Sequence, residues 1–272
     1  MEEMKATLSG EIDQSEKVQW ELSSNVLCNY MKKQEYLDLV LNNQAIVPRY
    51  VIEPLDYLGL GNLQKICFPM TCFCDIPFSK ISTHMSHYGE YGIGLDKESA
   101  LKRYGIQPIH YINECSPLGK DFSDAFRKYN NPNIKVNAAD EILLDYLLTT
   151  LLYMKPIQRH EKDKDDNLVT HVYQDECEWR FIPKILSTTR LPLILHPNET
   201  NDKAREVYSS TLLRHDECWL KFSWEDVRYI IVPNELSVFH TINTIKKLDI
   251  DEGEKDFLIS KIEVSKRIIE NS

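Results

Sequence analysis

The pattern of apolar and polar residues predicts short strands and helices that follow one another in no regular order. Runs rich in β-branched and aromatic residues predict strands at 26–30, 72–75, 92–95, 108–112, 169–173, 178–183 and 227–232. Apolar residues at helical spacing predict helices near 33–41, 137–154, 202–213, 237–247 and 254–269. Because the strands are separated by helices of uneven length, without regular β-α-β units, we expect an α+β fold.

The helix expected at 137–154 has a clear start signal. Asn137 can cap it, and acidic residues follow in the first turn, where they complement the helix dipole. From Ile142 to Met154 this helix is apolar on nearly every side, which predicts a central, buried position. The charged run at 159–167 instead predicts a solvated loop.

The length of 272 residues suits one large domain with appended segments. No linker rich in proline, glycine or serine divides the chain, and no segment repeats at a fixed period. We therefore expect an N-terminal extension at 1–21, one α+β domain at 22–235 and C-terminal helices at 236–272.

Charge narrows the range of partners. The chain carries 42 acidic against 32 basic residues, a formal charge of −10, so its surface as a whole repels phosphate backbones and anionic lipids. Broad nucleic-acid binding is therefore disfavoured. A local groove could still hold a phosphate if it brought together Arg49, Lys80, Arg103 and Arg180.

Cysteine usage and hydropathy indicate the compartment. The seven cysteines are scattered and odd in number, which favours reduced thiols over a disulfide framework. The first 21 residues lack an apolar core of signal-peptide length. The longest apolar run, at 142–154, is interrupted by Asp145 and is too short to cross a bilayer. We expect a cytoplasmic protein that does not span a membrane.

Two stretches mix ionisable residues with aromatic and β-branched neighbours. A strand that only fills the core does not need this mixture, so these stretches are candidates for a site. The first includes Cys72, Cys74, His84 and His87. Thiolate and imidazole ligands suit zinc, but this spacing matches no known zinc module, and buried cysteines are the simpler interpretation. A Cys-His nucleophile pair lacks an identifiable third orienting group. We therefore expect no metal site here.

The second stretch, at 176–180, reads Glu-x-Glu-Trp-Arg. On a strand, Glu178 and Arg180 share one face, whereas Trp179 faces the core on the other side. An arginine beside a carboxylate is often a structural ion pair, so a structural role and a site role both stay open. The glycines within 89–94 lack the spacing of a dinucleotide loop or a P-loop and predict a tight turn into a strand, with the lining of a ligand groove as the alternative.

Taken together, these motifs resemble those of the AbiGi-type abortive phage-resistance proteins. The likeness covers about residues 22–240, and it rests on segments 24–27, 48–49, 72–77, 87–94, 176–180 and 230–233 and on the helix that ends near 43. Members of that family are described as the antitoxin-side partner of a two-gene phage-exclusion system. The resemblance therefore implies a phage-defence protein that binds a protein partner, either a toxin or a phage component.

A looser resemblance concerns the ADP-ribosyltransferase fold, in which a late strand supplies a Glu-x-Glu motif. It implies NAD as the cofactor and Glu178 as the catalytic carboxylate, with Glu176 and Arg180 beside it. A carboxylate at the ribose hydroxyls of NAD stabilises the oxocarbenium-like transition state as nicotinamide leaves. The opening strand departs from that fold's pattern, because Asn29 and Met31 stand where a histidine and a threonine are expected.

We expect the two stretches to form one cleft, since ligand pockets set a few polar groups among apolar anchors. Arg49 or Arg180 would hold a phosphate bidentately. The remaining residues expected at the cofactor are Asn29, Asp75, His87 and Tyr88.

Three functions fit the sequence. The first is an antitoxin or sensor that binds a partner and whose NAD cleft is degenerate. The second is an ADP-ribosyltransferase or NAD glycohydrolase that uses Glu178. The third is a nuclease-like or metal-dependent effector, which is disfavoured because the sequence has no carboxylate cluster at metal-binding spacing. We favour the first, because Asn29 and Met31 depart from the pattern of the enzyme.

Overall fold

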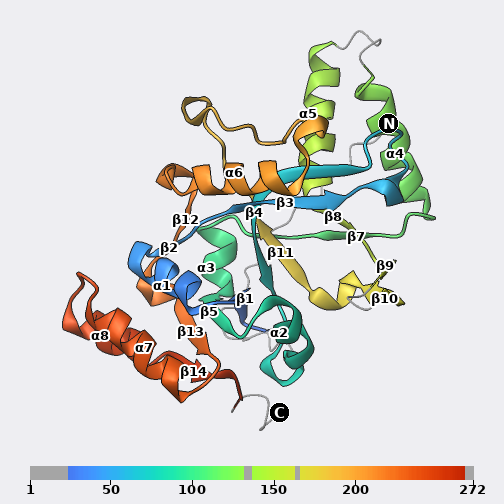
Figure 1. Ribbon diagram of the computed structural model, residues 1–272. Coiled ribbons are helices and arrows are strands. Elements are labelled where there is room, and N and C mark those ends of the chain that lie inside the picture. Colours follow the sequence, from blue (N-terminus) through green and yellow to red (C-terminus); the bar gives the residue numbers. More distant parts are fainter. Residues whose placement is uncertain (1–23, 132–136, 163–165, 267–272) are drawn as a thin grey trace, which may run out of the picture.

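A mostly antiparallel sheet of eight strands forms the centre of the computed structural model, which describes residues 24–131, 137–162 and 166–266 (Figure 1). Seven strands follow the order β14-β13-β5-β1-β4-β11-β6, and β3 pairs with the other half of β4. Among the described strands of this sheet, only β13 and β14 pair in parallel. The α+β prediction is therefore confirmed. The strands are β1 (Val26–Met31), β3 (Arg49–Pro54), β4 (Lys65–Cys74), β5 (Tyr91–Asp96), β6 (Gln107–Pro108), β11 (Glu178–Phe181), β13 (Val227–Val232) and β14 (Ile262–Val264).

Three two-stranded ladders, eight α-helices and seven short 3₁₀ helices make up the other regular elements of the described part of the chain. The ladders are β2 (Ala45–Ile46) with β12 (Leu220–Lys221), β7 (His110–Ile112) with β8 (Met154–Pro156), and β9 (Gln158–Lys162) with β10 (Leu168–Val172). The helices are α1 (Gln34–Asn43), α2 (Ser82–Tyr88), α3 (Lys97–Lys102), α4 (Pro117–Tyr129), α5 (Ala138–Leu152), α6 (Asp202–Leu212), α7 (Glu235–Lys246) and α8 (Glu252–Ile259). None of these helices is long and apolar enough to cross a membrane.

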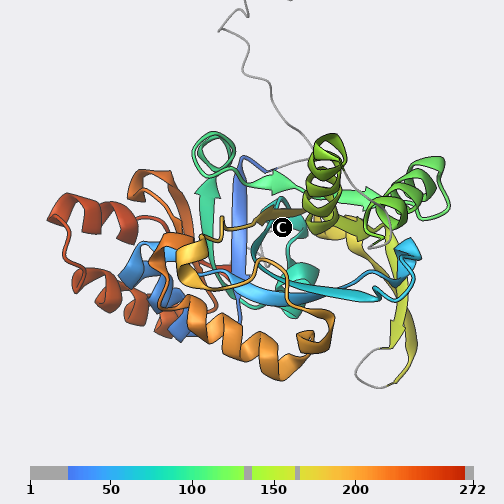
Figure 2. The same ribbon diagram turned by 90° about the horizontal axis from the view of Figure 1, so that it is seen from above.

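Strand β4 joins the two largest clusters of core residues. Its first half pairs with β3 and points Phe68 into a cluster shared with α4 and α5. Its second half pairs with β11 and points Phe73 into a cluster shared with α1, α3, α7 and α8. In a smaller cluster of core residues, Met85 of α2 packs against residues of β1 and β4. Strand β4 therefore lies between the red α7 and α8 on one side of the molecule and the green α4 and α5 on the other (Figure 2).

Helix α5 confirms the predicted helix but not its predicted central position. The start is as expected, because Asn137 and Asp140 form a capping box. The helix lies beside α4 at one end of the molecule (Figure 1). Its buried side is narrow, and Ile142 is 73% exposed. Apolar residues on every side therefore did not indicate burial on every side. The buried residues are Leu147, Leu151 and Leu152.

The charged run at 159–167 is not the solvated loop that we predicted. Residues up to 162 form β9, which pairs with β10 from Lys162 opposite Leu168 to Gln158 opposite Val172. This ribbon is solvated along much of both strands, so charged side chains are compatible with the strand conformation. Residues 163–165 of the run lie outside the described residues.

The helix expected at 254–269 is also wrong in its second half. A capping box of Asp251 and Glu254 starts α8, which ends at Ile259. The alternating Ile262-Glu263-Val264 then pairs with β13 and extends the sheet. Residues after 266, like the extension expected at 1–21, lie outside the described residues.

The predicted turn before β5 is confirmed. Gly89 has φ 123°, and a Cβ there would lie 2.1 Å from the carbonyl oxygen of Met31. Only glycine fits this close approach. The turn follows α2, which packs against β1, and Tyr88 at the end of α2 bonds to Glu176 just before β11.

Candidate functional site

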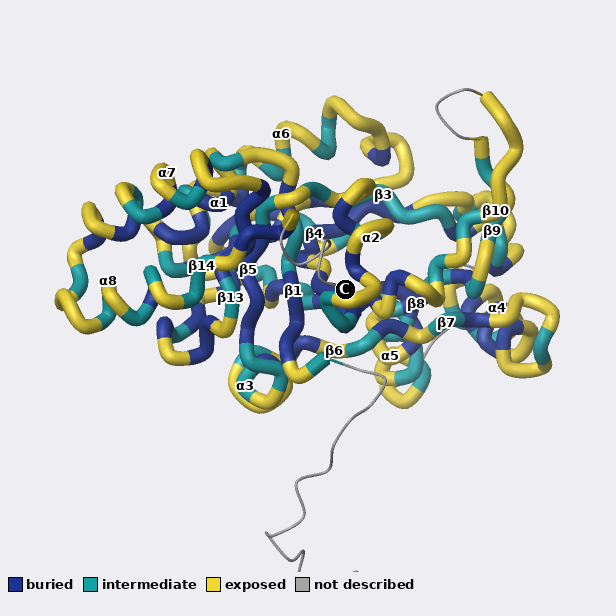
Figure 3. The backbone as a smooth tube through the Cα atoms, turned by 90° about the horizontal axis from the view of Figure 1, so that it is seen from below, coloured by how far each residue is buried: buried dark blue, intermediate teal, exposed yellow. Residues whose placement is uncertain are grey.

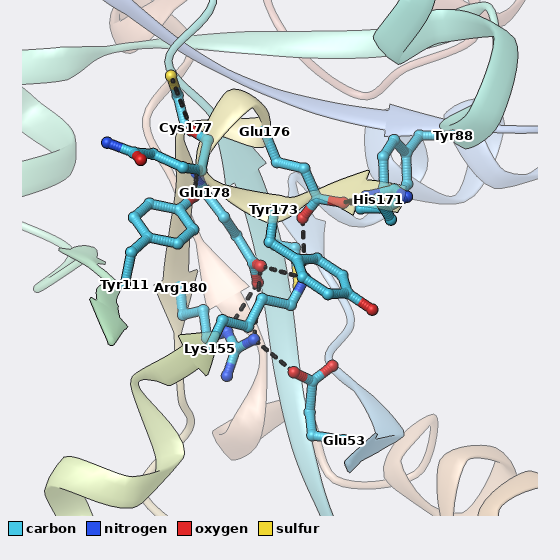
Figure 4. A network of polar contacts seen from close by, with 12 residues as sticks. Glu53, Tyr88, Tyr111, Lys155, His171, Tyr173, Glu176, Cys177, Glu178 and Arg180 are labelled. Carbon is cyan, nitrogen blue, oxygen red and sulfur yellow. Dashed lines mark hydrogen bonds and ion pairs between the residues drawn. The ribbon is translucent and has the colours of Figure 1, made fainter. Parts of the chain in front are cut away.

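A buried ionic network surrounds the Glu-x-Glu-Trp-Arg motif (Figure 4). Register places Glu178 opposite Cys74 and Arg180 opposite Cys72. The Arg180 side chain is fully buried, and its guanidinium donates hydrogen bonds to three residues. Its Nε donates to Glu178 Oε1 at 2.7 Å, and its terminal nitrogens donate to Glu53 Oε2 at 2.8 Å and to the carbonyl of Leu152 at 2.7 Å. The arginine thus links β11 to β3 and to the end of α5.

Lys155 of β8 is the second cation of the network. Its Nζ lies 2.8 Å from Glu176 Oε2 and 2.8 Å from Glu178 Oε2, and it sits over the ring of Tyr173. Burial lowers the pKa of Lys155, but the surrounding carboxylates outweigh burial and raise that pKa well above its usual value. Lys155 is therefore a permanent cation in the folded protein.

Glu178 is held as a carboxylate by these two cations. Burial raises its pKa, but Arg180 and Lys155 outweigh burial and lower that pKa to about 2. Only 6% of the residue is exposed, and Tyr111 Oη accepts a hydrogen bond from its backbone N–H. Both carboxylate oxygens are occupied by cations, so neither is directed at solvent.

Glu176 connects the network to the outer elements. Tyr88 Oη donates to its Oε1, and Nε2 of His171 lies 2.9 Å from the same oxygen. Tyr88 belongs to α2 and His171 to β10, so one carboxylate joins the two elements to the sheet (Figure 4). Beside Tyr88, the ring of His84 stacks at 4.4 Å between centroids, and burial lowers the pKa of His84 to about 4. His84 is therefore neutral at pH 7.

Replacing Glu176 with alanine is expected to loosen the β9–β10 ribbon. The substitution leaves Lys155, Tyr88 and His171 without their shared acceptor, and hydrogen bonds to charged groups contribute about 1.5–3 kcal/mol each. Amide hydrogen exchange in β9 and β10 should therefore quicken at least about 10-fold, more than in β1 or β5. Glu98→Ala, which removes an exposed carboxylate from α3, is the control. Equal exchange in both variants would contradict an anchoring role for Glu176.

The residues expected at a cofactor do not form one cleft. Arg49 is exposed, and its guanidinium lies over the ring of Tyr36. Asp75 pairs with Lys97 and accepts the backbone N–H of Ser24 at 2.9 Å. The two stretches do pack together, because β4 pairs with β11 and Tyr88 bonds to Glu176, but Arg49 and Asp75 do not join the side chain of Arg180. Strand geometry is the reason, because Arg49 pairs with Met70, four residues along β4 from Cys74, and Asp75 follows the end of β4.

The other expected residues lie nearer to the network but are bonded elsewhere. The side-chain amide of Asn29 donates to the carbonyl of Cys72 at 2.8 Å. His87 is exposed, with Nδ1 at 2.8 Å from the carbonyl of Thr83. Its ring lies 6.4 Å from the ring of His171 between centroids. Of the residues expected at the cofactor, Tyr88 alone joins the ionic network.

The phosphate groove considered from the sequence does not assemble. Arg180 is buried, and Arg103 pairs with Glu225 and Asp226. The thiol of Cys74 is also internal, and burial raises its pKa well above the usual range, so it is a neutral core thiol.

The network contains residues that sequence reasoning missed. The missed residues are Glu53 of β3, Tyr111 of β7 and Lys155 of β8, which lie 21 or more residues before Glu176, and His171 of β10, which precedes Glu176 by five residues. Only Lys155 had a visible signal, because it is a single cation directly after a long apolar run. A buried lysine requires carboxylate partners, which could have directed attention to Glu176 and Glu178.

Comparison with known proteins places the chain in a family. Residues 44–233 match the family described as "Putative abortive phage resistance protein AbiGi, antitoxin". The abortive phage resistance protein AbiGi of Lactococcus lactis subsp. cremoris is 32% identical over 250 residues, which cover 84% of this chain and 99% of that protein. No solved structure matches the chain. Because the family match spans most of the chain and the relative is matched over nearly its whole length, this chain belongs to the AbiGi family of abortive phage resistance proteins.

Proposed function

We propose that this chain is the antitoxin-side component of a two-gene abortive-infection system and that it acts by binding a protein partner. The family description carries the word antitoxin, which supports this role. The structural observation that favours binding over catalysis is the state of Glu178, whose two carboxylate oxygens are both held by buried cations.

NAD chemistry does not fit the residues present. An ADP-ribosyl transfer needs a carboxylate that reaches the ribose hydroxyls and stabilises the developing cation. Glu178 could do so only after separating from Arg180 and Lys155, which would leave buried charges unpaired. Asn29, on the opening strand, is bonded to the Cys72 carbonyl. If the fold derives from an ADP-ribosyltransferase, its catalytic carboxylate has become a structural one.

We also propose that the protein acts in the cytoplasm. All seven cysteines are free in the structure, and the described helices include no membrane span. Free thiols are typical of a reducing compartment.

The test uses the product of the gene beside that of this chain. We expect this chain to have no effect on bacterial growth when it is expressed alone and to relieve the growth arrest caused by the neighbouring protein. The two purified proteins should form a complex of fixed stoichiometry by size-exclusion chromatography with light scattering. Growth arrest by this chain alone, abolished in Glu178→Gln, would contradict the proposal and support the enzyme.

A further inference from the structure

Helix α5 exposes an apolar ridge that no described element covers. Ile142 is 73% exposed and Tyr146 is 65% exposed, and they lie one turn apart on the same side of the helix. Leu143 and Leu148 are only partly buried at its flanks. Helices that are apolar on every side are usually buried on every side, yet this one lies at the rim of the molecule (Figure 3).

An acidic row runs beside this ridge. Glu141 and Asp145 are both exposed, and each directly precedes a ridge residue in the sequence. Neither side chain forms an ion pair or a hydrogen bond within the part of the chain that the structure describes. The outer face of α5 therefore offers two large apolar side chains flanked by two unpaired carboxylates.

We propose that the outer face of α5 is the surface that binds the partner, and that the partner contributes a basic amphipathic helix. The inference rests on the proposed antitoxin role. An amphipathic helix buries its apolar side against large apolar residues, as Ile142 and Tyr146 are, and basic residues at its border pair with Glu141 and Asp145. Tyrosine is also among the residue types that dominate binding energies when they become buried in an interface.

Charge disfavours the two other candidate occupants. A second copy of this chain carries the same formal charge of −10, and an antiparallel two-fold pairing of α5 would bring the acidic rows to the same side. The segment 1–21 of the chain itself holds six acidic and two basic residues, so it too is of the same sign as Glu141 and Asp145. A basic partner is the occupant that complements this face.

The test measures binding of the neighbouring gene product to variants of the whole chain. In Ile142→Ser/Tyr146→Ser the dissociation constant should rise at least about 30-fold, as expected when interface anchors are removed. Glu141→Lys/Asp145→Lys should weaken binding at least about 10-fold and reduce its sensitivity to salt. These side chains are exposed, so the variants should keep the circular dichroism spectrum and melting temperature of the wild type.

The matched control is Leu236→Ser/Phe239→Ser on α7, which removes two apolar side chains of similar exposure, 78% and 66%. It should change the dissociation constant by less than about 2-fold. Unchanged binding in both α5 variants would overturn the inference but leave the antitoxin role in place, whereas absence of binding by the wild type would overturn both. A wild-type dimer that the Ile142/Tyr146 variant loses, or tighter partner binding after removal of residues 1–21, would assign the face to this chain itself and also overturn the inference.

Discussion

Replacing Arg180 with methionine is expected to lower the free energy of unfolding by about 3–5 kcal/mol, because loss of one partner leaves a buried charge unpaired. In this protein the variant would remove the donor to the carboxylate of Glu53 and the carbonyl of Leu152, and it would leave Glu178 with Lys155 as its remaining cation. Urea unfolding followed by circular dichroism measures the change.

The control for this substitution is Lys102→Met, which also removes a cation from an ion pair. Lys102 is 71% exposed and pairs with Glu98 on the surface, and such pairs contribute less than about 1 kcal/mol. If Arg180→Met cost no more than the control, the network would not be a structural element of the core.

The second large effect is on acid stability. The pKa of Glu178 is about 2 in the folded protein against an ordinary value of 4.5, so the folded state binds its proton more weakly than the unfolded state does. The resulting stabilisation, about 3 kcal/mol, is fully present above pH ~4.5 and is lost as the pH falls toward 2. Stability should therefore fall steeply across this window.

Lys155→Met should move this loss of stability to higher pH. The lysine is one of the two cations that lower the pKa of Glu178, so its removal raises that pKa and diminishes the stabilisation that depends on it. Urea unfolding between pH 3 and pH 7 measures the two profiles. Lys120→Met, a substitution at an exposed position of α4, should keep the wild-type profile. A Lys155→Met profile parallel to that of the wild type would show that Glu178 is not paired with this lysine.

Much of the sheet could be predicted from local sequence. The strands near 26–30, 92–95 and 227–232 are short blocks of apolar and β-branched residues. The composition of each block is enough to predict that it forms a strand. Strand β3 and the first half of β4 were missed, although they form a long antiparallel pair. Helix α4 was also missed, although its start is visible in the sequence. Ser116 caps the helix and Pro117 occupies its first turn, a combination that is typical of a helix N-terminus.

Position within the fold was harder to predict than conformation. The composition of α5 predicts a helix, but nothing local says whether α5 lies at the centre or at an end. The charged run before β10 forms a strand because β10 pairs with it, which is a tertiary effect. Likewise, Ile262–Val264 follows α8 closely and forms a strand because it pairs with β13 at the edge of the sheet.

Only the contacts between residues close in sequence could be predicted for the candidate site. The alternation of Glu178 and Arg180 on one face of a strand followed from their spacing, and they do contact each other. The partners that determine what this pair can do, Glu53 and Lys155, come from β3 and β8. Whether a carboxylate is free for chemistry or neutralised in the core depends on such distant residues.

Growth of cells that express the neighbouring gene together with Glu178→Gln tests the central claim most directly. Glutamine keeps the size and shape of the side chain, and the assay is run at a temperature at which circular dichroism shows the variant folded. If this chain acts by binding a partner, Glu178→Gln should relieve growth arrest as fully as the wild type does. Loss of relief by a folded Glu178→Gln that still binds the partner would contradict the account, because the carboxylate would then perform chemistry rather than hold the fold together.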